Sequence, residues 1–177
     1  KITNCSADRV RLYTRSDIQQ SKLVDNLTIV GFTGESIESE PAGFTGTLVS
    51  RATITGCNVG RLDLYGAGIT DRGLCEYDIS NTVVFDQFTA GQSKIAASNC
   101  SLRLAGDGRL NYLNEGSTFS NCRILLPYDA GTTTATSMDL YASTGDGKFG
   151  CNFDNCKILV DTDAAAPITG YLVKSSL

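Results

Sequence analysis

A six-residue pattern that recurs along the chain constrains the fold more than any other feature of this sequence. The pattern is an apolar residue, then Ser, Thr or Asp, then Asn or Gly, then Cys, Leu or Thr, then any residue, and last an aliphatic residue or Ala. Its seven copies read ITNCSA, VDNLTI, ITGCNV, ISNTVV, ASNCSL, FSNCRI and FDNCKI. Their third residues are Asn4, Asn26, Gly56, Asn81, Asn99, Asn121 and Asn155. Recurring self-similarity of this kind indicates a repeat architecture.

The third position of each copy predicts a sharp bend of the backbone. Asn and Gly enter the left-handed helical region at low cost, whereas β-branched residues do not. Gly56 replaces Asn in one copy, which indicates that the position requires a backbone conformation rather than a particular side chain. Successive bends lie between 18 and 34 residues apart, an interval that suits one coil of a solenoid with loops of variable length.

The residues on either side of each bend have the alternation of β-strands. Cys122, Ile124 and Leu126 would share one face of a strand, and Phe119 would end the preceding strand facing the same interior. Stacked coils therefore predict an asparagine ladder bonded through side-chain amides, a column of thiols and a column of aliphatic residues. The expected thiol column is Cys5, Cys57, Cys100, Cys122 and Cys156, and the expected aliphatic column is Ile29, Val59, Val84, Leu102, Ile124 and Ile158.

Composition limits the classes of protein that this chain can belong to. Seven cysteines cannot all pair within one chain, and no His and no zinc-like cysteine spacing is present, so we expect buried free thiols, Cys75 and Cys151 included. Free thiols suit assembly in a reducing cytoplasm. The net charge of −4 argues against nucleic acid or an anionic membrane as partner. Neither a membrane span nor a signal peptide is expected. The best helical candidate, residues 13–27, lacks a clean apolar stripe.

These features together resemble the right-handed parallel β-helix of the pectin-lyase-like superfamily. The resemblance covers Asn4 to Val160, and the irregular coils and unpaired cysteines look most similar to bacteriophage tailspike and tail-fibre domains. It implies an all-β single-stranded solenoid of about seven coils with inserted surface loops. We expect residues 1–177 to form one such domain and, because neither terminus looks like a cap, to be part of a longer chain.

The same resemblance implies a homotrimer on the virion tail, assembled in the host cytoplasm, that binds bacterial surface polysaccharide (capsule or O-antigen). It does not separate binding from cleavage, and fold alone does not assign a reaction. No cofactor and no metal are implied. Two alternatives stay open: a free-standing polysaccharide lyase or hydrolase of the same fold, and a purely structural trimeric shaft.

Candidate site residues come from two apparent insertions and an acidic column. The insertions are residues 31–46, which contain Glu35, Glu38 and Glu40, and residues 127–150. The acidic residues that recur seven or eight positions after a bend are Asp63, Asp107, Asp129 and Asp163. They would accept hydrogen bonds from sugar hydroxyls or hold Ca²⁺; the alternative is that Asp is simply a good turn residue.

The absence of His removes the commonest general base, so hydrolysis would depend on two carboxylates. The candidate catalytic pairs are Asp107 with Asp129 and Asp139 with Asp146, each of which has ordinary surface acid as its alternative. The candidate substrate-binding residues are Tyr65, Tyr112, Tyr128 and Tyr141, with Asp63 and Asp163. Tyrosine can stack on a sugar ring, although a half-buried structural tyrosine is the commoner case.

Overall fold

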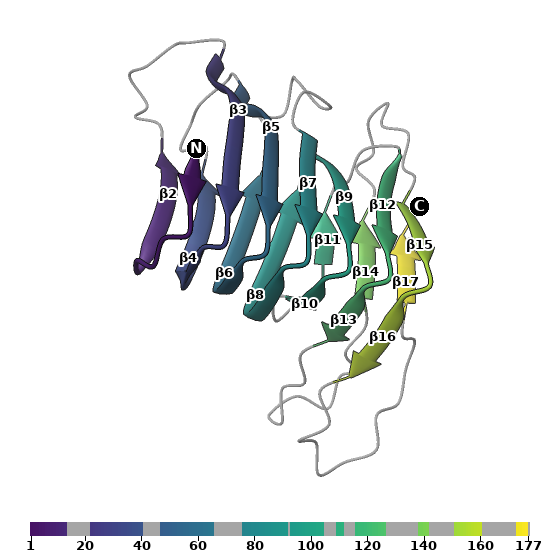
Figure 1. Cartoon of the computed structure of the whole chain (residues 1–177). Coiled ribbons are helices and arrows are strands. Elements are labelled where there is room, and N and C mark those ends of the chain that lie inside the picture. The colour runs from purple at the N-terminus through teal and green to yellow at the C-terminus, as the bar shows by residue number, and fades with distance from the viewer. Residues whose placement is uncertain are drawn as a thin grey trace.

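The chain is all-β wherever the structure describes it. The structure is a computed structural model, and it describes residues 1–13, 22–40, 47–65, 76–91, 93–104, 109–111, 116–126, 138–141, 151–160 and 173–176. Every strand pairing among these residues is parallel, and they contain no helix (Figure 1). No helix that could span a membrane is found in this part of the chain.

The strands form two sheets. The first sheet contains, in spatial order, β1 (Ile2–Thr3), β3 (Lys22–Val30), β5 (Thr47–Thr55), β7 (Glu76–Ser80), β9 (Lys94–Ser98), β12 (Ser117–Ser120) and β15 (Cys151–Asp154). The second sheet begins with β2 (Arg9–Tyr13), β4 (Thr33–Glu40), β6 (Asn58–Tyr65) and β8 (Val83–Gly91). Beyond β8 it divides into two rows, which are β10 (Ser101–Leu104), β13 (Arg123–Leu126) and β16 (Lys157–Val160), and β11 (Arg109–Asn111), β14 (Met138–Tyr141) and β17 (Val173–Ser176).

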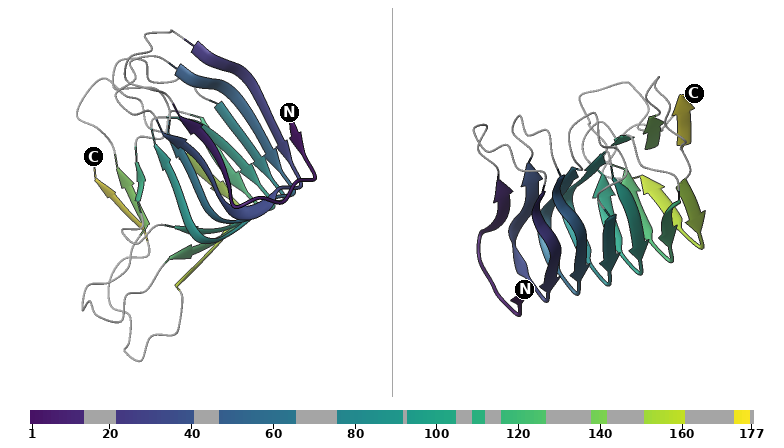
Figure 2. Two further views of the ribbon diagram at one scale, coloured as in Figure 1. Left: turned by 90° about the vertical axis from the view of Figure 1, so that its left-hand side faces the viewer. Right: turned by 90° about the horizontal axis from the view of Figure 1, so that it is seen from above.

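Each first-sheet strand is joined to a second-sheet strand by a bend at a residue with positive φ. Six of the seven predicted bends are confirmed, with φ between 49° and 62° at Asn4, Gly56, Asn81, Asn99, Asn121 and Asn155. The bends lie one beside the next along an edge of the molecule (Figure 2, right). The backbone N–H of Asn99, for example, donates to the carbonyl of Ser120 at 3.0 Å. The predicted amide ladder is present where Asn155 Nδ2 donates to Asn121 Oδ1 at 2.7 Å.

The seventh predicted bend is wrong. Asn26 lies inside β3, paired with Arg51, and the chain bends instead at Gly31, where φ is 63°. An added Cβ at Gly31 would lie 2.6 Å from Asn4 Oδ1, so the neighbouring bend also favours glycine there. The sequence VDNLTI fits the pattern by residue type, but it continues as a strand up to the true bend.

This correction moves Ile29 from the column after the bends to the column before them. Ile29 pairs with Ile2 on one side and Ile54 on the other. The place expected for Ile29, beside Val59, belongs to Gly34. An added Cβ at Gly34 would overlap the carbonyl oxygen of Ala7 and lie 2.6 Å from the ring of Phe32, so the neighbouring backbone and the large residue after the bend both require glycine here.

The structure corrects one other expectation about local structure and also excludes the weak helical candidate where its residues are described. Residues 33–40, expected as part of an inserted loop, form strand β4 between β2 and β6. Residues 22–27, the end of the helical candidate, belong to β3. Both strands, β3 and β4, lie between two parallel strands and form backbone hydrogen bonds to each of them. This pairing outweighs the weak local preference of the sequence for a loop or a helix.

At six of the seven bends the next residue is a small hydrogen-bond donor, Cys or Thr; the exception is Phe32 after Gly31. The thiol of Cys100 donates to the carbonyl of Ser98, two residues earlier, at 3.1 Å, and the hydroxyl of Thr82 does the same to Ser80 at 3.0 Å. Burial raises the pKa of the Cys57 thiol, which keeps it protonated as a donor at neutral pH. The cysteines at this position therefore close the bend, and Cys57, Cys100 and Cys122 also fill the core. The expected burial of the whole column is wrong at its ends, because Cys5 is exposed and Cys156 is half-buried.

One continuous core lies between the two sheets. The register of the first sheet stacks Phe119 on Phe153, with ring centroids 5.1 Å apart and planes inclined by 15°. Tyr77 of the first sheet and Ser39 of the second share a hydrogen bond of 3.3 Å between their hydroxyls, across the buried interior. The second sheet curves around this interior (Figure 2, left).

Candidate functional site

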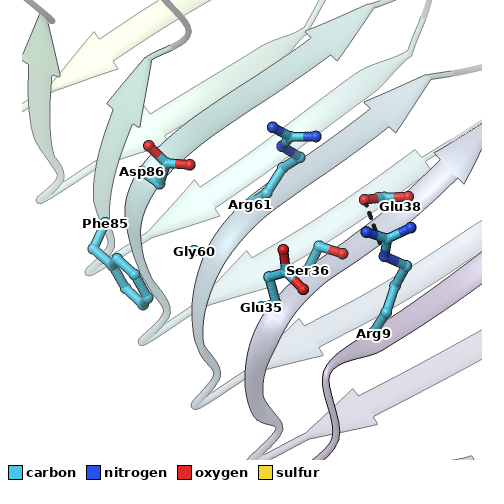
Figure 3. A pocket seen from close by; sticks show the side chains of 8 residues that line it. All are labelled: Arg9, Glu35, Ser36, Glu38, Gly60, Arg61, Phe85 and Asp86. Atoms are coloured by element: carbon cyan, nitrogen blue, oxygen red, sulfur yellow. Dashed lines mark ion pairs between the residues drawn. The ribbon is translucent and has the colours of Figure 1, made fainter.

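A pocket of about 350 Å³ opens on the outward side of the second sheet (Figure 3). Strands β2, β4, β6 and β8 contribute its residues. They are Arg9, Glu35, Ser36, Glu38, Gly60, Arg61, Phe85 and Asp86. We call this the corner pocket.

The corner pocket lies where two neighbouring strands, β6 and β8, interrupt their alternation at the same level. In β6 two residues, Gly60 and Arg61, separate the buried Val59 from the buried Leu62. The neighbouring β8 inserts one residue more, and its register with β6 shifts at this point. Interrupted alternation bends a strand and turns consecutive side chains away from the core.

Gly60 forms the floor of the hollow between an acid and an aromatic ring. An added Cβ at Gly60 would lie 2.9 Å from the carbonyl oxygen of Glu35 and 3.5 Å from Cε2 of Phe85. Phe85 is 58% exposed, the largest exposed fraction among the large apolar side chains that the structure describes. A glycine here therefore leaves one edge of an aromatic ring accessible beside a carboxylate (Figure 3).

Two arginines flank Ser36 in the next row. Arg9 pairs with Ser36 across β2 and β4, and Ser36 pairs with Arg61 across β4 and β6. Ser36 is 1% exposed, and its hydroxyl has no hydrogen-bond partner among the described residues. A buried polar group without a partner is uncommon and calls for an explanation.

Both arginines are already engaged by carboxylates. Arg9 Nε lies 3.6 Å from Glu38 Oε1, and Arg61 Nε lies 3.9 Å from Asp63 Oδ2. Arg11 approaches the other oxygen of Glu38 at 3.6 Å, and Glu38 is only 8% exposed. These ion pairs occupy the charged groups on one side of the pocket.

The other acids of the pocket are not engaged in this way. Glu35 and Asp86 are exposed, and neither forms an ion pair with any residue in the described ranges. An exposed ring, free carboxylates and guanidinium donors are groups that bind sugar rings and their hydroxyls, by stacking and by hydrogen bonding.

The predicted site residues lie partly outside the described ranges. Those outside are Asp107, Asp129, Asp146, Asp163, Tyr112 and Tyr128. Asp63 lies within β6, beside Glu38 in register and close to the corner pocket. Asp139 and Tyr141 belong to β14, where only the backbone is described.

Tyr65 and Tyr141 share one register position of the second sheet. Tyr65 pairs with Gly91, Gly91 with Asn111, and Asn111 with Tyr141. At about 4.8 Å per strand their backbones are about 14 Å apart. Both tyrosines remain predictions as substrate contacts.

The sequence interpretation missed most of the corner pocket. Phe85, Asp86, Gly60, Arg61, Arg9 and Ser36 were not singled out, and Glu35 and Glu38 were assigned to a loop. One signal was available: in the segment VVFDQF three residues separate Val84 from Phe88, where strict alternation would place one. The assembly of the pocket itself depends on register between strands far apart in sequence.

A shallower hollow of about 170 Å³ lies on the first sheet and is lined by small residues such as Ser80, Ala96 and Thr118. Among the described residues, no group of three or more metal-binding side chains occurs. Comparisons of this chain with protein-family models, with curated proteins and with solved structures found no match.

Proposed function

We propose that this chain is a right-handed parallel β-helix domain of the bacteriophage tailspike or tail-fibre type, and that it binds a bacterial surface polysaccharide, capsule or O-antigen, at the corner pocket. Parallel strands that alternate between two sheets, with hydrogen-bonded bends one above the next, support the fold. The proposal extends to a homotrimer on the virion tail, assembled in the host cytoplasm. The described cysteines are all free thiols, which is compatible with assembly in a reducing compartment.

The observation that carries the proposed binding is the exposed Phe85 ring beside Gly60. An aromatic ring that served only to stabilise the fold would be expected in the core, whereas the Phe85 ring is 58% exposed. Here it lies next to the Gly60 floor and shares the pocket with Glu35 and Arg61. The apolar face of a sugar can cover the ring while its hydroxyls reach the carboxylate and the guanidinium.

A depolymerase that cleaves the glycan is the second candidate. Glu38 and Asp63 are directly paired in register on adjacent strands, which brings two carboxylates close together at the edge of the pocket. Glycoside hydrolysis uses two carboxyl groups about 5 to 10 Å apart. Release of reducing ends from a bound polysaccharide, lost in Asp63→Asn, would support cleavage; binding without release would leave a binding protein.

An array of capsular and O-antigen polysaccharides tests the proposal directly. Wild-type protein should bind a subset of them, and Phe85→Ala should weaken that binding about tenfold, the size of one lost ring contact. Because Phe85 is mostly exposed, the free energy of unfolding should change by no more than about 0.5 kcal/mol. Light scattering at three times 18.8 kDa would support the trimer.

Val83→Ala is the matched control for this array. Val83 is 43% exposed on the same strand but does not line the pocket. Its substitution should leave binding unchanged. Equal losses in the two variants, or none in Phe85→Ala, would contradict the assignment of the site.

A further inference from the structure

We infer that the corner pocket selects glycans that carry a free, positively charged amino group. The inference rests on the proposed polysaccharide binding and names the chemical class of sugar that the pocket takes. The inference is argued from four residues that line the pocket: Glu35, Asp86, Phe85 and Ser36.

The charges of the pocket divide into a paired half and an unpaired half. Arg9 and Arg61 each have a carboxylate within 4 Å, although Glu38 is shared between Arg9 and Arg11. Counted with Glu35 and Asp86, these four carboxylates face three guanidinium groups, which gives a net charge of −1. Glu35 and Asp86 lie in the same pocket without an ion pair in the described part of the chain. Complementary charge gives a binding site its specificity, and the uncompensated charge here is negative.

The aromatic ring favours the same ligand. A cation within about 6 Å of a ring centroid is attracted by the negative face of the ring. Phe85 is exposed directly beside Asp86 and across Gly60 from Glu35 (Figure 3). An ammonium group between the ring and Glu35 would therefore meet both, while Asp86, whose carboxylate points away from the ring in Figure 3, adds negative charge at another part of the same pocket.

Ser36 supplies independent support, because its buried hydroxyl lacks a partner. The residue is 1% exposed and lines the pocket, and its oxygen has no hydrogen-bond partner within the described ranges. A primary ammonium has three N–H donors and no acceptor, so it needs neighbouring oxygens of this kind. A ligand that reaches Ser36 would satisfy a group that the protein leaves unsatisfied.

An acidic sugar is the competing ligand, and the geometry favours it less. Its carboxylate would have to share guanidinium groups that Glu38 and Asp63 already approach. It would also enter beside Glu35 and Asp86, whose negative charges oppose it.

Chitosan oligosaccharides, and the same preparation after chemical N-acetylation, form a matched pair of probes. Titration calorimetry is performed at low salt and at a mildly acidic pH, which keeps the amine of the probe protonated. The free-amine form should bind about tenfold more tightly than the acetylated form, as a cation beside a ring and acids would. Added salt should reduce that preference.

Variants locate the effect. Glu35→Gln and Asp86→Asn should each reduce the preference for the free amine while the acetylated form binds as before. Asp154→Asn removes the same charge from an exposed position on β15 and should keep the preference intact.

Equal affinity for the two forms would overturn the inference while leaving polysaccharide binding in place. Tighter binding of an oligouronate than of the free-amine form would overturn it in favour of an acidic sugar. Binding of neither chitosan form would overturn it as well, and the polysaccharide array then decides separately whether the proposed function stands.

Discussion

The two sheets of this molecule differ in how strictly they repeat. In the first sheet the pairings run without a register shift from β1 to β15, so Ile2, Ile29, Ile54 and Ile79 follow one another in line. In the second sheet the register shifts on both sides of β8, and the sheet divides beyond that strand.

The corner pocket lies where the second sheet departs from regularity. Strands β6 and β8 carry two and three residues between successive core positions, whereas β10 carries only Arg103 between the buried Leu102 and Leu104. The pocket includes residues of β8 but none of β10. Regular stacking accounts for the core, and irregularity creates the hollow of the corner pocket.

The largest expected effect on stability comes from comparing two stacked phenylalanines of the first sheet, one inside the sheet and one in its last strand. Phe119→Ala should lower the free energy of unfolding by about 3 to 5 kcal/mol, because Phe119 is 1% exposed in a packed core. Phe153→Ala should cost less, about 1 to 2 kcal/mol, since that ring is half-buried in the last strand of its sheet. Denaturant unfolding measures both, and equal losses would contradict the difference.

An intermediate effect on stability is expected when the same substitution is made at an asparagine in a bend and at an asparagine in a strand. Asn99→Val should cost about 1 to 2 kcal/mol, because a β-branched residue resists a φ of 52°. Asn26→Val should change stability little, since Asn26 is an exposed strand residue that merely matched the bend pattern. Asn99→Gly serves as the control and should be close to neutral. Similar costs at both asparagines would refute the assignment of the bends.

These contrasts define what the sequence could predict. Six bends were readable because left-handed backbone restricts residue choice at one position, whatever the surroundings. The bend at Gly31 was not predicted because the residues after it do not match the pattern. Phe32 follows Gly31 where the pattern requires Cys, Leu or Thr, and Gly34 lies where the pattern requires an aliphatic residue or Ala. That exchange depends on the packing of Phe32 and on the close backbone of Ala7, and it has no local signal.

The candidate site was less predictable for a related reason. Arg9, Ser36 and Arg61 become neighbours only through the register of three strands. In sequence each looks like an ordinary outward strand residue. Of the acids predicted from spacing, Asp107, Asp129 and Asp163 lie outside the described ranges, and Asp63 lies in β6.

The smallest expected effect concerns an exposed ion pair on the first sheet. Arg51 Nε donates to Glu76 Oε2 at 3.2 Å, and this hydrogen bond holds the pKa of Glu76 below its ordinary value of 4.5. Because the folded pKa is the lower one, the contribution to stability is complete above pH 4.5 and is lost as the pH falls through the folded pKa. Arg51→Gln should remove that part of the acid dependence.

Unfolding measured across this acidic range, for wild type and Arg51→Gln, checks the sign. The difference between the two proteins should shrink as the pH falls, and it should be smaller than either effect above because the pair is exposed. A difference that grows toward low pH would contradict the assignment of Glu76.

The most direct test of the binding site is nuclear magnetic resonance of the labelled protein during titration with a polysaccharide fragment that it binds. The backbone amide signals of Gly60, Phe85 and Asp86 should shift together, while those of Ala96 and Thr118 on the first sheet stay in place. Shifts confined to the first sheet, with the corner pocket silent, would show that the glycan binds elsewhere.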